Sequence, residues 1–185
     1  MAVTHEDAAT ALRLADEAGE RSAMLRGYQS TAPHLILWGM IYAVAYAFSY
    51  ARPAQAGIAW AVLVVAGSVA SMVIGGRDRS DRVAGSRKWA IVPALFVTFL
   101  AFIIATGAVM QPQDPRQMAA FVPLVVAVAY IVMGLGAGRR IAFAGVALGV
   151  LTLVGYFGFP AIFMLWMAIV GGGTLILSGL WLRRV

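Results

Sequence analysis

An evenly spaced row of aromatic and imidazole side chains is the part of this sequence with the most potential for chemistry. His34, Trp38, Tyr42, Tyr46 and Tyr50 occupy every fourth position of an apolar run. Histidine can ligate haem iron or titrate near neutral pH, and buried tyrosine and tryptophan need hydrogen-bond partners. A four-residue step turns a helix by about 400°, so each member is rotated about 40° from the last. The whole row therefore cannot line one straight pocket.

Two interpretations of this row stay open. In the first, the end members His34, Trp38 and Tyr50 anchor a helix at the bilayer interfaces, while the tyrosines at mid-depth pack. In the second, His34, Trp38, Tyr42 and Tyr46 form a candidate ligand-binding site, with haem as the alternative cofactor. Apart from that alternative, we expect no cofactor, no metal site and no catalytic residue.

Several kinds of chemistry are excluded by residues that the chain lacks. It contains no cysteine, which removes disulfides, thiolate nucleophiles and cysteine-ligated metal centres. It has no paired-histidine metalloprotease motif and no acidic cluster that could hold magnesium. Its long apolar runs carry no Asp, Glu, Lys or Arg, groups that ion-coupled transporters commonly place near the midplane. We therefore expect a protein that is not an enzyme.

Composition places these residues in a membrane. The chain of 185 residues is 62% hydrophobic and 12% charged, with a mean hydropathy of +0.85, whereas about 25% of residues are charged in a soluble domain. Charges separate uncharged runs at 27–51, 53–76, 89–113, 117–138 and 141–182. The last run is about twice the length of one span, so it must turn, and 155–160 offers two glycines and a proline.

The expected fold is an all-α integral membrane protein. Six transmembrane helices form three hairpins, with spans at about 33–51, 56–75, 89–110, 118–137, 140–157 and 160–182. Residues 1–32 form a cytoplasmic amphipathic helical arm, and 33–184 form the membrane domain. The arm has no continuous apolar core, so we expect no cleavable signal peptide.

The basic residues orient the chain, because cytoplasmic loops retain an excess of Lys and Arg. With the N-terminus inside, only Arg52 and Arg116 lie outside, and twelve basic residues lie inside: Arg13, Arg21, Arg26, Arg77, Arg79, Arg82, Arg87, Lys88, Arg139, Arg140, Arg183 and Arg184. We expect a bacterial inner-membrane protein with both termini in the cytoplasm. The basic residues behind the net charge of +6 then lie against anionic headgroups of the lipid bilayer, and we expect no nucleic-acid partner.

The three hairpins have comparable ends. SVASMVIGGR at 68–77, YIVMGLGAGRR at 130–140 and GTLILSGLWLRR at 173–184 each place small residues before arginine. This organisation, over about residues 33–184, resembles the small bacterial HdeD-like acid-resistance membrane proteins, which implies a six-span bundle and a role in acid protection. The junction EAGERSAMLRGYQSTAPHLILWG at 17–39 is similar to uncharacterised bacterial membrane proteins encoded beside winged-helix regulators.

Small residues at helical spacing mark expected helix contacts. The set comprises Gly67, Ser71, Gly75, Gly134, Gly138, Gly145 and Gly149. Four-residue spacing of small side chains lets two helices approach closely within a bilayer. We favour packing inside the bundle, and a homodimer through one such face is the alternative. The isolated Ser and Thr hydroxyls in the spans are expected to bond carbonyl groups of their own helices.

The arm is the second distinctive feature. Thr4 can cap a helix, and Ala8, Ala11, Leu12, Ala15 and Gly19 fall along one apolar stripe. Three basic and five acidic residues through position 32 give a charge of −2, which disfavours adsorption to an anionic leaflet.

The arm has two candidate contacts, the basic loop at 77–88 and a cytoplasmic protein partner. The sequence thus favours a non-catalytic scaffold, sensor or regulatory protein that binds through its arm and basic loops. A carrier or receptor for an apolar ligand or haem within the bundle is the alternative.

Overall fold

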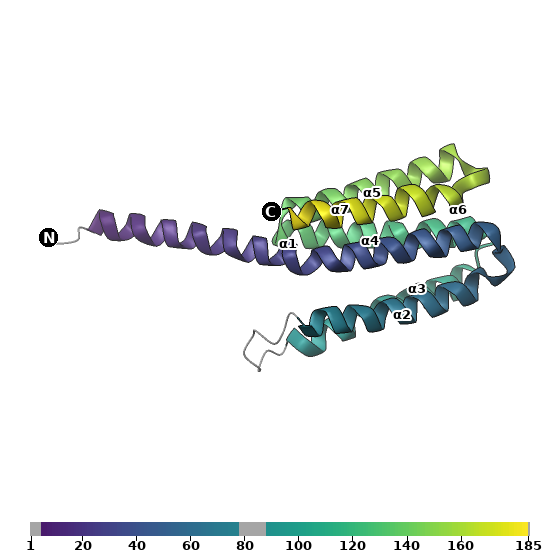
Figure 1. The fold of residues 1–185 in the computed structure, drawn as a ribbon, viewed down its shortest axis with the longest axis horizontal. Helices are drawn as coiled ribbons and strands as arrows, with labels where there is room; N and C mark the ends of the chain where they lie inside the picture. Colours follow the sequence, from purple (N-terminus) through teal and green to yellow (C-terminus); the bar gives the residue numbers. More distant parts are fainter. Residues whose placement is uncertain (1–4, 78–87, 185) are drawn as a thin grey trace.

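Every regular element in the described part of the chain is helical (Figure 1). The computed structural model describes residues 5–77 and 88–184. In chain order the elements are α1 (His5–Ala51), the 3-10 turn η1 (Pro53–Gln55), α2 (Ala56–Arg77), α3 (Lys88–Met110), α4 (Pro115–Ala137), α5 (Arg139–Gly158), the 3-10 turn η2 (Pro160–Ile162), α6 (Phe163–Trp166), the π-helical turn η3 (Met167–Gly171) and α7 (Gly172–Arg183). The expected cap at Thr4 and most of the basic loop, residues 78–87, lie outside the described residues.

The arm and the first apolar run form one helix. α1 continues without a break through 47 residues, about 70 Å at about 1.5 Å per residue. Ala, Leu, Glu and Arg dominate the arm and are strong helix formers. Pro33 lies within α1 and supplies no amide hydrogen, yet the helix continues past it. The boundary drawn at residues 32 and 33 is therefore a change of composition and not a break in secondary structure.

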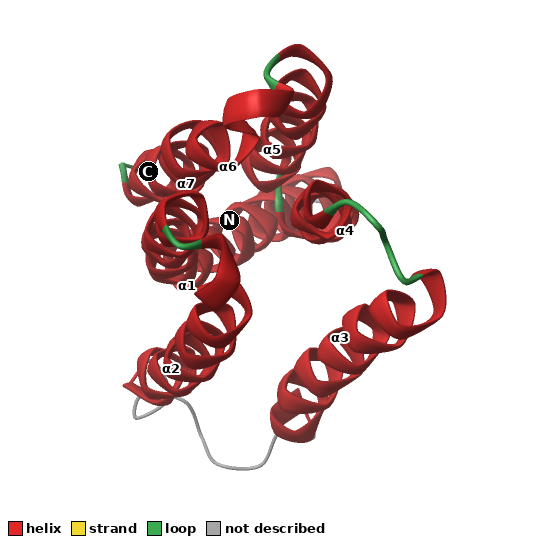
Figure 2. Cartoon of the chain, turned by 90° about the vertical axis from the view of Figure 1, so that its right-hand side faces the viewer, coloured by secondary structure: helices red, strands yellow, loops and turns green. Residues whose placement is uncertain are grey.

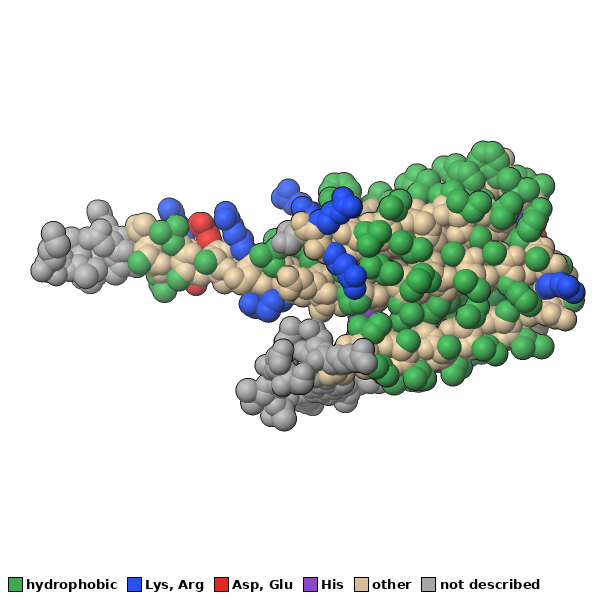
Figure 3. Space-filling view, viewed as in Figure 1, with side chains coloured by type: hydrophobic (Ala, Val, Ile, Leu, Met, Phe, Trp, Pro, Cys, Tyr) green, Lys and Arg blue, Asp and Glu red, His purple; other side chains and the backbone are tan. Residues whose placement is uncertain are grey.

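Five helices of the described part are long and apolar enough to cross a membrane. They comprise Thr10–Ala51, Pro53–Gly76, Pro115–Gly136, Arg139–Gly158 and Pro160–Arg183, and a shorter apolar helix covers Val97–Met110. Large apolar side chains are exposed along these helices, and Lys and Arg gather near the ends of the bundle (Figure 3). So large an exposed apolar surface needs a non-aqueous surrounding. The chain is thus an all-helical protein with several helices suited to a membrane.

Local sequence explains where these helices begin and end. Asp114 caps α4 by accepting a 2.8 Å hydrogen bond from the Arg116 amide, and Pro115 occupies the first turn. The Arg116 guanidinium bonds the same carboxylate and holds the pKa of Asp114 below its usual value. α4 ends at Gly138, whose φ of +120° suits glycine. The last apolar run is interrupted at Phe159, within the segment where the sequence predicts a break.

Four helices form a compact group, and α2 and α3 lie outside it. α1 packs mainly on α7 and α4 on α5, and these four surround most of the buried apolar core. α2 lies along α1, whereas α3 stands apart from the compact group in the end view (Figure 2). In its described part, α3 meets α4 near the end of the helix, where Gly107 faces Met118 and the rings of Phe102 and Phe121 lie 6.1 Å apart.

Glycines allow α1 and α7 to approach backbone to backbone. A Cβ added to Gly172 would lie 2.9 Å from both the Gly39 carbonyl oxygen and the Ala43 amide nitrogen. A Cβ on Gly179 would lie 2.8 Å from the Ala32 carbonyl oxygen. Since real Cβ atoms almost never come this close, the contact requires glycine at these positions.

We expect Gly172→Ala to lower the free energy of unfolding by about 1–3 kcal/mol, because the added methyl group must push α1 away from α7. Thermal unfolding of the purified protein in detergent measures this change. Gly173→Ala is the matched control, since a Cβ there would meet no described atom of another helix within 4 Å. Equal unfolding temperatures for the two variants would contradict the close contact.

Candidate functional site

The structure places the five residues of the row from His34 to Tyr50 in different surroundings. Tyr42 and Tyr46 are buried, and Tyr50 is 49% exposed at the far end of α1. His34 and Trp38 are partly buried, and both interact with other residues. The row therefore has a buried middle and accessible ends, as the rotation between successive members requires.

Tyr42 and Tyr46 belong to an aromatic cluster that also includes Trp60 of α2. The three rings meet edge to face, with centroid distances of 5.0 Å from Tyr46 to Trp60, 5.5 Å between the tyrosines and 5.8 Å from Tyr42 to Trp60. The Trp60 indole donates a 3.2 Å hydrogen bond to Ser49 Oγ, which donates to the Ala45 carbonyl at 2.7 Å. We call Tyr42, Tyr46 and Trp60 the aromatic cluster.

Trp60 was not predicted from the sequence as a member of this cluster. The short turn at η1 was the available signal, because a tight antiparallel connection places the start of α2 beside the end of α1. Residues near position 60 then face residues near position 49.

Tyr46 satisfies a backbone carbonyl that a proline leaves without its helical donor. Its hydroxyl donates a 2.5 Å hydrogen bond to the Ala119 carbonyl of α4. The residue four positions after Ala119 is Pro123, which lies inside α4 and has no amide hydrogen. Tyr46 thus replaces the missing helical hydrogen bond and ties α1 to α4.

The Tyr42 hydroxyl is different. It is buried, and neither it nor the Ser71 hydroxyl bonds another described group. In contrast, the hydroxyls of Ser68, Thr152 and Thr174 bond carbonyl groups of their own helices, as expected from sequence. A buried polar group without a partner costs about 1–3 kcal/mol, so Tyr42 marks a place where a hydrogen-bonding group would be favourable.

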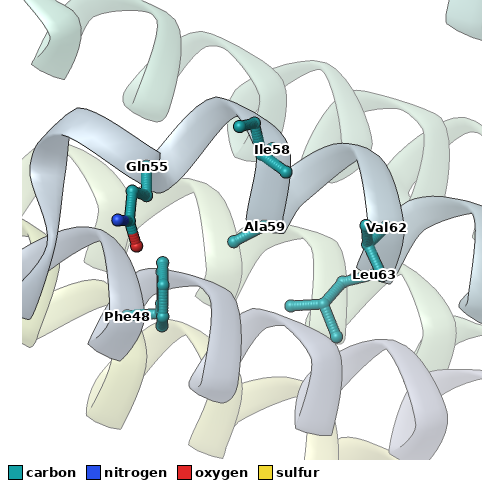
Figure 4. Close-up of a pocket in the computed structure, with 6 residues that line it drawn as sticks. All are labelled: Phe48, Gln55, Ile58, Ala59, Val62 and Leu63. Atoms are coloured by element: carbon teal, nitrogen blue, oxygen red, sulfur yellow. The ribbon is translucent and has the colours of Figure 1, made fainter.

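Two surface grooves lie elsewhere. One has a volume of about 400 Å³ and is lined by Phe48, Gln55, Ile58, Ala59, Val62 and Leu63 (Figure 4). The other, about 270 Å³, is lined by Gln117, Ala120, Phe121, Leu124, Leu153, Tyr156 and Phe157. None of His34, Trp38, Tyr42 and Tyr46 lines either groove. Among the described residues, no group of three His, Asp or Glu residues lies together to hold a metal ion.

Most of the small residues singled out from sequence lie at helix contacts. Gly67 faces Ile41 and Trp38 of α1, Gly134 faces Ala142, Gly145 faces the Ala127 carbonyl and Gly149 faces the Ala127 side chain. Gly138 lies against Tyr28, and Ser71 is partly buried in α2. A Cβ added to Gly75 would meet no described atom within 4 Å. Gly39, Gly172 and Gly179 were not predicted as helix contacts, although the seven-residue step between the last two was a usable signal.

Arg140 marks the level at which the arm leaves the bundle. Its guanidinium lies 4.7 Å from the ring centroid of Trp181 and 5.9 Å from that of Tyr28, and it donates a 3.4 Å hydrogen bond to the Trp181 carbonyl. These contacts join α1, α5 and α7 at one end of the bundle.

Beyond this level α1 extends away from the bundle (Figure 1), and every side chain from 10 to 26 is exposed. The arm is amphipathic. At about 100° per residue, its charged half, comprising Arg13, Asp16, Glu17, Glu20 and Arg21, covers about 140° of the helix. Ala, Leu, Gly and Ser fill the opposite side, except at Arg26 next to the bundle. Arg13 and Glu17 form an ion pair at 3.9 Å on the charged half.

A scan against protein-family models, a search of curated proteins and a search of solved structures each find no match to this chain. The likeness to HdeD-like proteins therefore remains a sequence-based expectation, and any function must be argued from the chain itself.

We expect Tyr46→Phe to destabilise the ligand-free protein by about 1–3 kcal/mol, because the Ala119 carbonyl loses its replacement donor. Tyr42→Phe, the matched control, should leave stability unchanged or raise it slightly. Unfolding in detergent measures both variants. Repeating Tyr46→Phe in a Pro123→Ala background should reduce the loss, since alanine restores a backbone donor. An unchanged loss in that background would refute the pairing of Tyr46 with the proline gap.

Proposed function

We propose that this protein is a non-catalytic scaffold or regulatory protein of the bacterial inner membrane. It binds a cytoplasmic protein through its arm and basic inner loops. One observation carries the proposal: α1 continues out of the bundle as an exposed helix, with no described part of the bundle packed on residues 10–26 (Figure 1). Long water-exposed helices with an apolar side are typical docking elements.

The membrane arrangement in this proposal has six spans in three hairpins and both termini in the cytoplasm. α3 supplies the sixth span through its 23 residues. The excess of Lys and Arg at the inner loops supports the orientation. The arm then extends into the cytoplasm beside these loops.

The partner is expected to carry basic groups that face Asp16, Glu17 and Glu20 of the charged half. Acidic groups on the same partner would face the basic inner loops. Such a surface of both signs favours a specific protein contact over adsorption to an anionic leaflet.

Photo-crosslinking in cells tests this proposal. A photoreactive residue replacing Glu20 should give a discrete product with a cytoplasmic protein, and the same residue replacing Gln55, exposed at the other end of the bundle, should not. Asp16→Lys together with Glu17→Lys should reduce the Glu20 product several-fold, because the charges facing the partner are reversed. A product that persists after charge reversal, or that appears equally from Gln55, would count against the proposed contact.

The unpartnered hydroxyl of Tyr42 favours a second candidate function, a receptor or carrier for an apolar ligand with one hydrogen-bonding group. Native mass spectrometry and an absorption spectrum of gently purified protein would then show a bound mass, lost in Tyr42→Phe. A haem would give a visible band, lost in His34→Ala. A spectrum of the protein alone, with no added mass and no visible band, would rule out this candidate.

A further inference from the structure

One face of α1 is uncovered along nearly its whole length. In the arm, Leu12, Ala15, Gly19 and Ser22 are exposed, with Leu12 at 66%. In the apolar part, Met40 and Val44 are exposed at 49% and 56%. We call Leu12, Ala15, Gly19, Ser22, Met40 and Val44 the outward face.

These two groups point in the same direction. Positions 18 apart on an α-helix coincide, because 18 steps of about 100° make about five full turns. Ser22 therefore lies above Met40, and Gly19 lies above Leu37. Since α1 is one helix from His5 to Ala51, the outward face is continuous from the arm into the bundle.

The other sides of α1 are occupied by its own chain. Gly39 contacts α7, Ile41 contacts Gly67 of α2, and Tyr46 bonds α4. The charged half of the arm also points away from the outward face, by the same rotation of about 100° per residue. The outward face is thus the side of α1 that the described chain leaves open.

Its position restricts what can cover it. Lipid can cover Met40 and Val44 but not the arm, and a soluble protein can cover the arm but not the part within the membrane. An occupant that covers both must carry a helix that passes from the cytoplasm into the bilayer without a break. α1 of a second copy has this property.

We propose that two copies of this chain pair in parallel along the outward faces of their α1 helices. The inference rests on the proposed placement of the arm in the cytoplasm, which gives both copies the same orientation. The two charged halves then face away from each other and remain accessible to the cytoplasmic partner. A partner with two matching sites would gain affinity from this arrangement.

The residue types suit such a pair. Positions 12, 15, 19 and 22 alternate steps of three and four, the spacing of a two-helix coiled coil. Three of the four side chains are small, which lets the helices approach closely. The flanking positions hold Ala11 and Ala18 on one side and Asp16 and Ala23 on the other, so these flanking positions bring no like charges together when the helices pair in register. Arg26 continues the same spacing, so the pair brings two arginines together at the membrane boundary, where anionic headgroups can neutralise them.

Disulfide crosslinking tests the pairing directly, because the chain contains no cysteine of its own. Ala15→Cys, Ser22→Cys and Val44→Cys are placed on the outward face. Glu17→Cys and Glu20→Cys on the charged half are controls, as is Val65→Cys, an exposed valine of α2. Each full-length variant is oxidised in native membranes.

The three outward-face variants should form at least about tenfold more disulfide-linked dimer than the controls, since a disulfide needs Cβ atoms about 3.5–4.5 Å apart. Comparable yields at all six positions, or no dimer from the outward face, would overturn the proposal.

A charge variant then separates this proposal from the proposed function. Ala15→Glu should reduce the Ser22→Cys dimer at least about tenfold, since it places two carboxylates in the seam. Thr10→Glu, which adds the same charge on the other side of the arm, should not. Dimer crosslinks without a partner product at Glu20 would refute the proposed function alone. A partner product with no dimer crosslinks would refute the pairing alone.

Discussion

Backbone hydrogen bonding in an apolar medium is the constraint on which this structure depends. A bilayer offers no water to unpaired amides and carbonyls, so each span must be helical and each break in a helix needs a substitute partner. Pro123 creates such a break in α4, and the Tyr46 hydroxyl fills it at the Ala119 carbonyl. A tyrosine that looked from sequence like a candidate ligand contact thus has a structural role, which connects α1 to α4 at the position where α4 lacks a bond.

The same constraint explains how the bundle is assembled. No hydrophobic force draws helices together once all are in lipid, so close packing and hydrogen bonds must do so. Gly39, Gly172 and Gly179 bring α1 and α7 to backbone contact, and the aromatic cluster joins α1 to α2. α1 is therefore the common partner of three other helices. The described part of α3 has few such contacts, and the end view shows it apart from the group.

Much of the helical layout could be predicted from the sequence, because charged residues and helix-breaking residues limit apolar runs. Asp114, Gly138 and Pro160 lie at or beside helix ends for reasons that single residues supply. Contacts between distant residues could not be predicted in this way. The hydrogen bond from Tyr46 to Ala119, 73 positions along the chain, depends on the relative depth of α1 and α4. The role of Gly172 depends on α1 lying opposite. Composition suggested a boundary after residue 32, but helix propensity carries α1 through it.

The continuity of α1 has a mechanical consequence. The exposed residues 10–26 extend about 25 Å beyond the bundle at about 1.5 Å per residue. A tilt of about 10° where the arm leaves the bundle would move its tip by about 4 Å. Pro33 lies just inside the bundle, where a missing backbone bond makes bending easier. The arm can thus change direction at Pro33 while the glycine contact between α1 and α7 stays in place.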